Sequence, residues 1–179
     1  MRILKSFLYI IITFIMVFVV VGFFLPQQQH IERHIVISAT ASEIFQNINS
    51  PKSFNQWSPW AKIDPETNYT YIGSEAGTGA GMTWSSDNPN VGSGSWMITD
   101  VKEYDYIKVD LDFGNEGVAT SFFDLKPDGE GTRITWGFDM DAGMNLMVRW
   151  MGLMMDKWVG GDYERGLANL KALVEGDSE

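Results

Sequence analysis

Apolar and polar side chains alternate along most of the chain after residue 30, the period-two pattern of strands that bury one face. The first run, residues 31–37, places Ile31, Ile35 and Ile37 on one face. Six more runs follow, at residues 68–72, 79–85, 93–101, 106–113, 118–125 and 132–140. The connections among these six are short and rich in Gly, Asn and Asp, which favours antiparallel pairing of neighbours. The pattern therefore predicts a seven-stranded antiparallel sheet.

The segment between the first two strands predicts two short helices. Thr40 and Glu43 have the spacing of a capping box, so a helix begins there and runs to about Asn47. Ser50 followed by Pro51 begins a second helix, ending near residue 57, because proline is accommodated in a first helical turn. The residue before a proline favours extended backbone, so residues 58–60 are predicted to leave this helix as extended chain.

The last segment, residues 145–174, predicts one long helix with two apolar stripes. The first stripe has helical spacing and is flanked by two more bulky side chains; it comprises Met147, Met151, Met154 and Trp158, with Trp150 and Met155 beside them. The second stripe comprises Tyr163, Leu167, Leu170 and Val174. The phase slips between the stripes at Gly160 and Gly161, which predicts a bend there.

Residues 6–25 contain no charged side chain and are long enough, as a helix, to cross the core of a bilayer. Arg2 and Lys5 precede this segment, which predicts a cytoplasmic N-terminus and an extracytoplasmic domain, periplasmic in a Gram-negative cell. The alternative is a cleaved signal peptide, although the segment is long for one and no small-x-small site follows. The expected division is an anchor over 1–26, a linker over 27–30, a domain over 31–176 and a tail over 177–179.

Composition narrows the possible partners. The net charge is −10, and residues 31–179 carry 11 basic against 23 acidic side chains, or −12. A domain this acidic repels phosphate backbones, so nucleic acid is not an expected partner. The chain has no cysteine, which excludes disulfides, thiolate metal sites and a cysteine nucleophile. The oligomeric state is left open by the sequence.

An antiparallel sheet with one apolar face needs a cover, and the C-terminal helix is the only element long and apolar enough to provide it. In this order of elements, the following segments resemble the SRPBCC superfamily: residues 31–39, 43–45, 57–60, 92–96 and 152–156. That superfamily includes START, pollen-allergen and polyketide cyclase/dehydrase-like proteins. The resemblance covers residues 31–175, is strongest to membrane-anchored bacterial members, and implies the helix-grip fold, an α+β class. No catalytic residue set of a characterised cyclase matches positions here.

A curved sheet closing on one helix is expected to leave a hollow of roughly 300–1,000 Å³. Its predicted lining consists of inward-facing Met and aromatic side chains: Met82, Trp84, Trp96, Phe113, Trp136, Phe138, Met147, Trp150, Met151, Met154 and Trp158. The alternative for each residue is a place in a filled core. Trp57 and Trp60 are the candidates for the entrance, or else pack the small helices onto the sheet.

Few side chains suggest chemistry. His30 and His34 are the only histidines, and His34 shares the polar face of the first strand with Glu32, so it is expected in solvent. Asp156 interrupts the apolar helix and is predicted to pair with Arg149, Lys157 or a strand residue, or else to reach the cavity as an acid. No cluster has metal-ligand spacing, so no metal or cofactor is expected.

Three functions stay open. The first is a membrane-tethered module that binds a hydrophobic small molecule or lipid. The second is a cyclase or dehydratase that moves protons within the cavity, which requires an ionisable group there. The third is an interaction protein with a filled core and an acidic outer sheet face as its partner surface.

Overall fold

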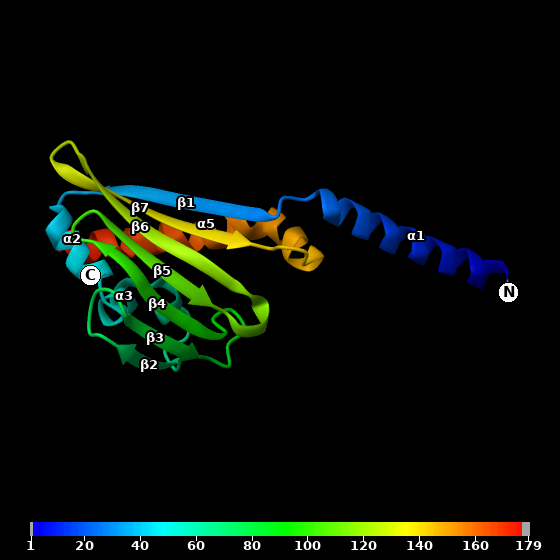
Figure 1. The fold of residues 1–179 in the computed structure, drawn as a ribbon, viewed down its shortest axis with the longest axis horizontal. Coiled ribbons are helices and arrows are strands. Elements are labelled where there is room, and N and C mark those ends of the chain that lie inside the picture. The colour runs from blue at the N-terminus through cyan, green and yellow to red at the C-terminus, as the bar shows by residue number, and fades with distance from the viewer. Residues whose placement is uncertain (1, 177–179) are drawn as a thin grey trace.

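The computed structural model describes residues 2–176. Its elements, labelled in Figure 1, are α1 (Arg2–Phe24), β1 (Gln28–Ile37), α2 (Ala41–Ile48), α3 (Pro51–Trp57), α4 (Pro59–Ile63), β2 (Asn68–Gly73), β3 (Ala80–Ser85), β4 (Ser93–Lys102), β5 (Tyr106–Asp112), the 3-10 turn η1 (Gly114–Glu116), β6 (Val118–Asp128), β7 (Gly131–Asp141) and α5 (Leu146–Glu175).

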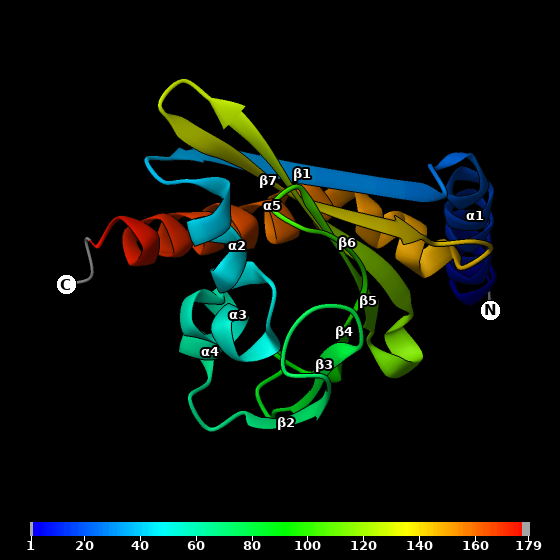
Figure 2. The same cartoon turned by 60° about the vertical axis from the view of Figure 1, so that its left-hand side comes forward.

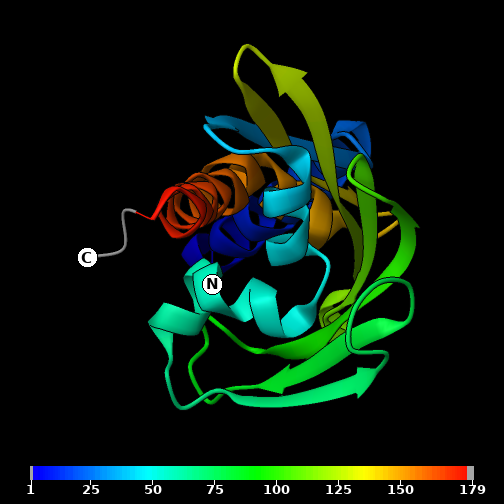
Figure 3. The same ribbon diagram turned by 90° about the vertical axis from the view of Figure 1, so that its left-hand side faces the viewer.

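All seven strands form one antiparallel sheet in the order β1-β7-β6-β5-β4-β3-β2. The predicted strands and their antiparallel pairing are confirmed. β1 begins at Gln28, three residues before the predicted start, because residues 28–30 pair with residues 139–141 of β7. Those three residues therefore belong to the sheet, which corrects the expected linker over 27–30. The sheet curls so that its concave face encloses α5 (Figure 3).

Three short helices, instead of the two predicted, follow β1. The capping box at Thr40 is present, with the Glu43 amide donating to Thr40 Oγ1 and the Thr40 amide donating to Glu43 Oε2. The predicted extended exit after residue 57 is wrong. Only Ser58 is extended, with φ −52° and ψ 129°, and Pro59 then occupies the first turn of α4. A proline restricts the residue before it but starts a helix well, which is the reason for the difference.

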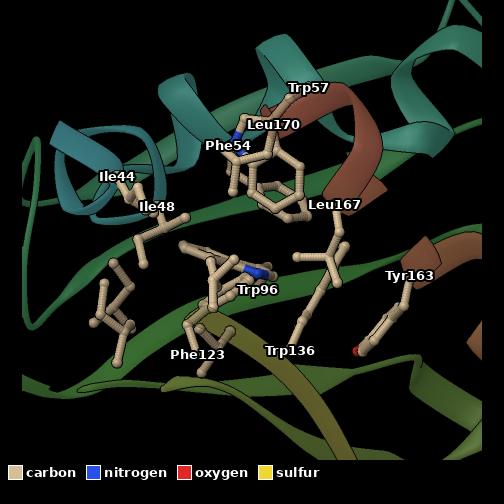
Figure 4. Close-up of a cluster of buried hydrophobic side chains, with 14 of the residues drawn as sticks. Ile44, Ile48, Phe54, Trp57, Trp96, Phe123, Trp136, Tyr163, Leu167 and Leu170 are labelled. Atoms are coloured by element: carbon tan, nitrogen blue, oxygen red, sulfur yellow. The ribbon is translucent and has the colours of Figure 1, made fainter. Parts of the chain in front are cut away.

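The second half of α5 lies on a filled core. Tyr163, Leu167 and Leu170 are at most 2% exposed, so the second predicted stripe is the one that packs against the sheet. Helices α2 and α3 contact α5 and the sheet from the open side of the concavity (Figure 2). Their side chains meet those of the sheet and α5 in one cluster, shown in Figure 4, in which Trp136 is central; its rings contact Phe54, Trp57, Trp60, Phe123 and Tyr163.

Strand β1 holds the adjacent side of α5 through Arg33. The Arg33 guanidinium pairs with Asp156 at 3.0 Å and with Glu164 at 2.7 Å. A Cβ at Gly160 would lie 2.2 Å from Arg33 Nη2, so this glycine allows the guanidinium to approach the helix. Helix α5 runs uninterrupted through this point. The bend expected at the two glycines stays a prediction.

Helix α1 projects from the end of the sheet where β1 begins (Figure 1). Within the described residues it is the one helix long and apolar enough to cross a membrane, over Lys5–Phe24, and only 6% of that span is buried. It contacts the body of the protein through α5. Its length and exposure are compatible with a membrane anchor and equally with a signal sequence.

Candidate functional site

A cavity of about 520 Å³ lies between the concave face of the sheet and the first half of α5. The sheet contributes side chains from β2 to β7, α5 contributes Val148, Met151, Met155 and Val159 among others, and α3 and α4 add Phe54 and Trp60. Most of these side chains are aromatic, aliphatic or thioether groups. The wall is therefore suited to an apolar molecule, with methionines able to adapt to its shape.

The cavity reaches the end of the sheet from which α1 projects. Residues 89–93 of the β3–β4 connection, Asn115 of η1 and Asn145 at the start of α5 are part of its wall. In the antiparallel register, Ser85 pairs with Ser93, Asp112 with Val118, and Gln28 with Asp141. The connections that follow these residues therefore all lie at the same end of the sheet. Gln28 is also where the chain arrives from α1.

Among the polar groups of the wall, Ser121, Trp136 and Tyr163 form a hydrogen-bonded cluster. Ser121 Oγ donates to the carbonyl of Gly137 at 2.9 Å and accepts from Trp136 Nε1 at 2.9 Å. The hydroxyl of Tyr163 lies 3.2 Å from the same oxygen. Because the single serine proton is directed at Gly137, the tyrosine proton is directed at Ser121. The Tyr163 oxygen keeps its acceptor capacity, so the wall can accept a hydrogen bond from a donor group on a ligand.

The ionisable side chains of the described wall are Tyr69, Asp162 and Tyr163. Burial raises the pKa of the Tyr163 hydroxyl, which therefore stays protonated across the physiological range. Burial also raises the pKa of Tyr69. The carboxylate of Asp162 pairs with Arg165 one turn along α5. The neutral Tyr163 hydroxyl is therefore suited to hydrogen bonding with a ligand.

The structure brings seven of the predicted cavity residues together in the wall: Met82, Trp84, Trp96, Phe113, Trp136, Phe138 and Met151. Four others lie outside it: Met147, Trp150, Met154 and Trp158. Met147, Met154 and Trp158 are 62%, 47% and 47% exposed, and Trp150 packs on Phe18 of α1. The first stripe thus points mostly outward, because β1, the cavity and the core occupy the other sides of α5.

The remaining candidates lie apart from the cavity, except Trp60, which is in its wall. Trp57 is 1% exposed within the core and is not at an entrance. Asp156 is on the surface and pairs with the β1 residue Arg33, one of the partners predicted for it. His30, on the outer face of the sheet, donates a hydrogen bond from Nδ1 to Asp139 Oδ1 at 2.7 Å, and this bond raises the pKa of His30. Among residues 2–176, no group of three His, Asp or Glu side chains is placed to hold a metal ion.

Ser121 was missed from the sequence, although a signal for it existed. It alternates in phase with Ala119, Phe123 and Leu125, so it places a hydroxyl on the apolar face of β6. Val148 and Val159 were also missed. They lie on the side of α5 between the two stripes, and no spacing argument distinguishes that side as the wall of a cavity.

A curved antiparallel sheet gripping a long C-terminal helix around an apolar cavity defines the helix-grip class of the SRPBCC superfamily. The model of the family "Polyketide cyclase / dehydrase and lipid transport" matches residues 28–175, and the chain belongs to this family. No curated protein matches the chain.

Solved structures agree on the fold. The crystal structure of protein Ms6760 from Mycobacterium smegmatis is 18% identical, covers 84% of this chain and 93% of its own, and has a TM-score of 0.60. Ara h 8.0201 is 11% identical, with coverage of 83% and 99% and a TM-score of 0.58. The Aha1 dimer from Colwellia psychrerythraea is 16% identical, with coverage of 82% and 96% and a TM-score of 0.53. At these identities the likeness concerns the fold alone.

Proposed function

We propose that this protein is a membrane-tethered binding domain that holds a hydrophobic small molecule or lipid in the cavity between its sheet and α5. The observation that carries the proposal is the cavity of about 520 Å³ itself, with its mainly apolar wall. This volume lies within the range of small-molecule sites. It argues against an interaction domain with a filled core.

The tether is α1. Its span from Lys5 to Phe24 is almost wholly exposed, so a lipid environment would satisfy side chains that nothing in the domain covers. The basic residues Arg2 and Lys5 at its start favour a cytoplasmic N-terminus, with the domain on the opposite side. A tethered domain would stay where apolar ligands partition.

Binding is favoured over proton-transfer catalysis by the polar groups of the wall. A cyclase or dehydratase needs a base that titrates near neutral pH. Here the buried hydroxyl of Tyr163 stays neutral and the Asp162 carboxylate is paired with a guanidinium. The acceptor oxygen at Tyr163 instead supports a ligand that carries one hydroxyl or amine on an otherwise apolar body.

The test compares two neighbouring methionines. Met155 is in the cavity wall, whereas Met154 is 47% exposed and outside it. Tryptophan is bulkier than methionine, so Met155→Trp should fill part of the cavity and Met154→Trp should not. The full chain, extracted from its membrane in mild detergent, is examined by native mass spectrometry for molecules that remain bound.

Wild type and Met154→Trp should retain a bound small molecule or lipid, and Met155→Trp should lose it. Lipid attached to the outside of α1 would be retained equally by all three proteins, so the difference between the two variants isolates the cavity. A wild type that carries nothing, or a Met155→Trp variant that retains as much as wild type, would refute the proposal.

A further inference from the structure

The outward face of the first half of α5 is apolar and uncovered. Met147, Met151, Met154 and Trp158 are between 47% and 62% exposed, at a spacing that aligns them along one side of the helix. We name these four residues the outer stripe. Exposed apolar surfaces of this kind mark sites of contact with a membrane or another protein.

The outer stripe begins where α5 meets the anchor helix. Trp150 stacks on Phe18 with ring centroids 4.8 Å apart, and its Nε1 donates to the Phe18 carbonyl at 3.3 Å. A Cβ at Gly22 would lie 3.0 Å from Trp150 Nε1 and 3.4 Å from Leu146 Cβ, so this glycine allows the two helices to touch. The contact fixes α5 beside the last turns of α1.

The position of this contact along α1 determines how deep it would lie in a membrane that α1 spans. Phe18 lies six residues before the helix ends at Phe24, which is about 9 Å along the axis. Amphipathic helices at membrane surfaces bury their apolar face by roughly 5–10 Å. If α1 spans the bilayer up to Phe24, Trp150 and the adjoining outer stripe lie at about that depth.

Charge along the first turns of α5 is compatible with this depth. Between Leu146 and Met155 the only charged residue is Arg149, which is 2% exposed. Its Nε donates to the Gly143 carbonyl at 2.9 Å and its Nη1 donates to the Phe23 carbonyl at 3.1 Å. The guanidinium thus binds one carbonyl at the end of α1 and one just before α5, and needs no contact with lipid.

Resting on the proposed membrane tether, we propose that the outer stripe of α5 lies in the headgroup and upper acyl region of the same bilayer, which sets the cavity wall at Met151 beside the membrane. Met151 connects the two surfaces, since it is 50% exposed in the stripe and also part of the cavity wall. A lipid-like ligand therefore has an apolar route along α5 from bilayer to cavity, without crossing water.

The chain has no cysteine, so single-cysteine variants take one spin label each without background. Labels at Met147→Cys and Met154→Cys test the stripe, Phe14→Cys tests α1, and Glu130→Cys at the exposed tip of the β6–β7 hairpin reports water. The full-length chain is reconstituted in phosphatidylcholine nanodiscs. Collisions of each label with oxygen, which concentrates in lipid, and with a water-soluble nickel complex are measured by electron paramagnetic resonance.

Both stripe labels should meet oxygen more often and nickel less often than Glu130→Cys does, and Phe14→Cys, deeper in the bilayer, should show this contrast most strongly. Near-ultraviolet circular dichroism of each variant checks that the tryptophan core is intact. Stripe labels that meet nickel freely while the α1 label stays in lipid overturn this inference and leave the tether standing. An α1 label in water overturns both.

Stripe labels shielded from both collision partners mean that protein, not lipid, covers the stripe. Spin–spin broadening would then identify a second copy of the chain as that cover. Either result also overturns the inference.

Discussion

Alanine at two glycines of α5 should shift stability in opposite directions. A Cβ at Gly166 would lie 2.6 Å from Trp136 Cζ3 and 3.2 Å from Pro59 Cδ, whereas a Cβ at Gly161 would meet only Arg165 Nη1, at 3.8 Å. Carbon atoms in good contact are about 3.5–4.0 Å apart. Gly166→Ala therefore overpacks the core by about 1 Å, and Gly161→Ala does not.

The tryptophan has little room to move away. The ring of Trp136 is stacked on that of Tyr163 with centroids 3.8 Å apart, and its Nε1 donates a hydrogen bond to Ser121 Oγ at 2.9 Å. Overpacking of this kind costs about 1–3 kcal/mol, partly offset by up to ~1 kcal/mol from the higher helix propensity of alanine. Gly166→Ala should be destabilised by about 1–2 kcal/mol, which lowers Tm by roughly 2–8 °C in a chain of this size.

Gly161→Ala should keep only the propensity gain, about 1 kcal/mol, and raise Tm by roughly 2–4 °C. Thermal unfolding of the full chain in nanodiscs, followed by near-ultraviolet circular dichroism, measures both variants against wild type. An equal rise in both variants would refute the described packing of α5 on the tryptophan core. A fall in Gly161→Ala would show instead that the backbone there needs glycine, as the predicted bend requires.

Three further results are expected. Leu167→Ala removes a side chain that is 1% exposed and should lower the free energy of unfolding by about 2–5 kcal/mol. Leu153→Ala removes one that is 60% exposed and should change it by less than ~0.5 kcal/mol. A denaturant titration measures both, and equal losses would contradict the assigned burial. Tyr163→Phe removes the oxygen that would accept a hydrogen bond from 2-naphthol, so the variant should lose any preference for 2-naphthol over naphthalene, roughly 2- to 10-fold in relative affinity by calorimetry. An unchanged preference would show that the Tyr163 hydroxyl does not contact the ligand. The pKa of His30, measured by NMR titration, should lie above its ordinary value of 6.5, chiefly because of the hydrogen bond to Asp139. The pair then stabilises the fold at pH below 6.5, and this stabilisation is lost as the pH rises through the raised pKa. A titration midpoint at or below 6.5 would contradict the pairing.

The sheet could be predicted from the sequence because each strand is encoded locally. Apolar and polar side chains alternate at period two in any strand that buries one face. Connections as short as those here can join only strands that run antiparallel side by side. The start of β1 was missed because Gln28 and Gln29 are polar on both faces and are held only by pairing with β7. Helix α4 was missed because a proline both restricts the residue before it and favours a helix start, and the sequence does not decide between these effects.

The orientation of α5 could not be predicted in the same way. Its two stripes have equal spacing, and a hydrophobic pattern shows that a face avoids water without showing what covers it. The sheet-facing stripe at Tyr163 and Leu167 and the outer stripe at Met147 and Met154 look alike in sequence. Alternation assigns each strand side chain to a face, which is why the strand residues of the cavity wall could be proposed from the sequence as a group.

The short junction between α1 and β1 limits what the proposed binding domain could do as a carrier. Only Leu25, Pro26 and Gln27 separate α1 from β1, a stretch that reaches about 10 Å. The amide of Ala142 also holds the carbonyl of Gln27 at 2.8 Å. If α1 is the membrane anchor proposed above, a domain mounted this closely could not shuttle a ligand between distant membranes. A bound ligand would then be taken up and released at the bilayer that holds α1.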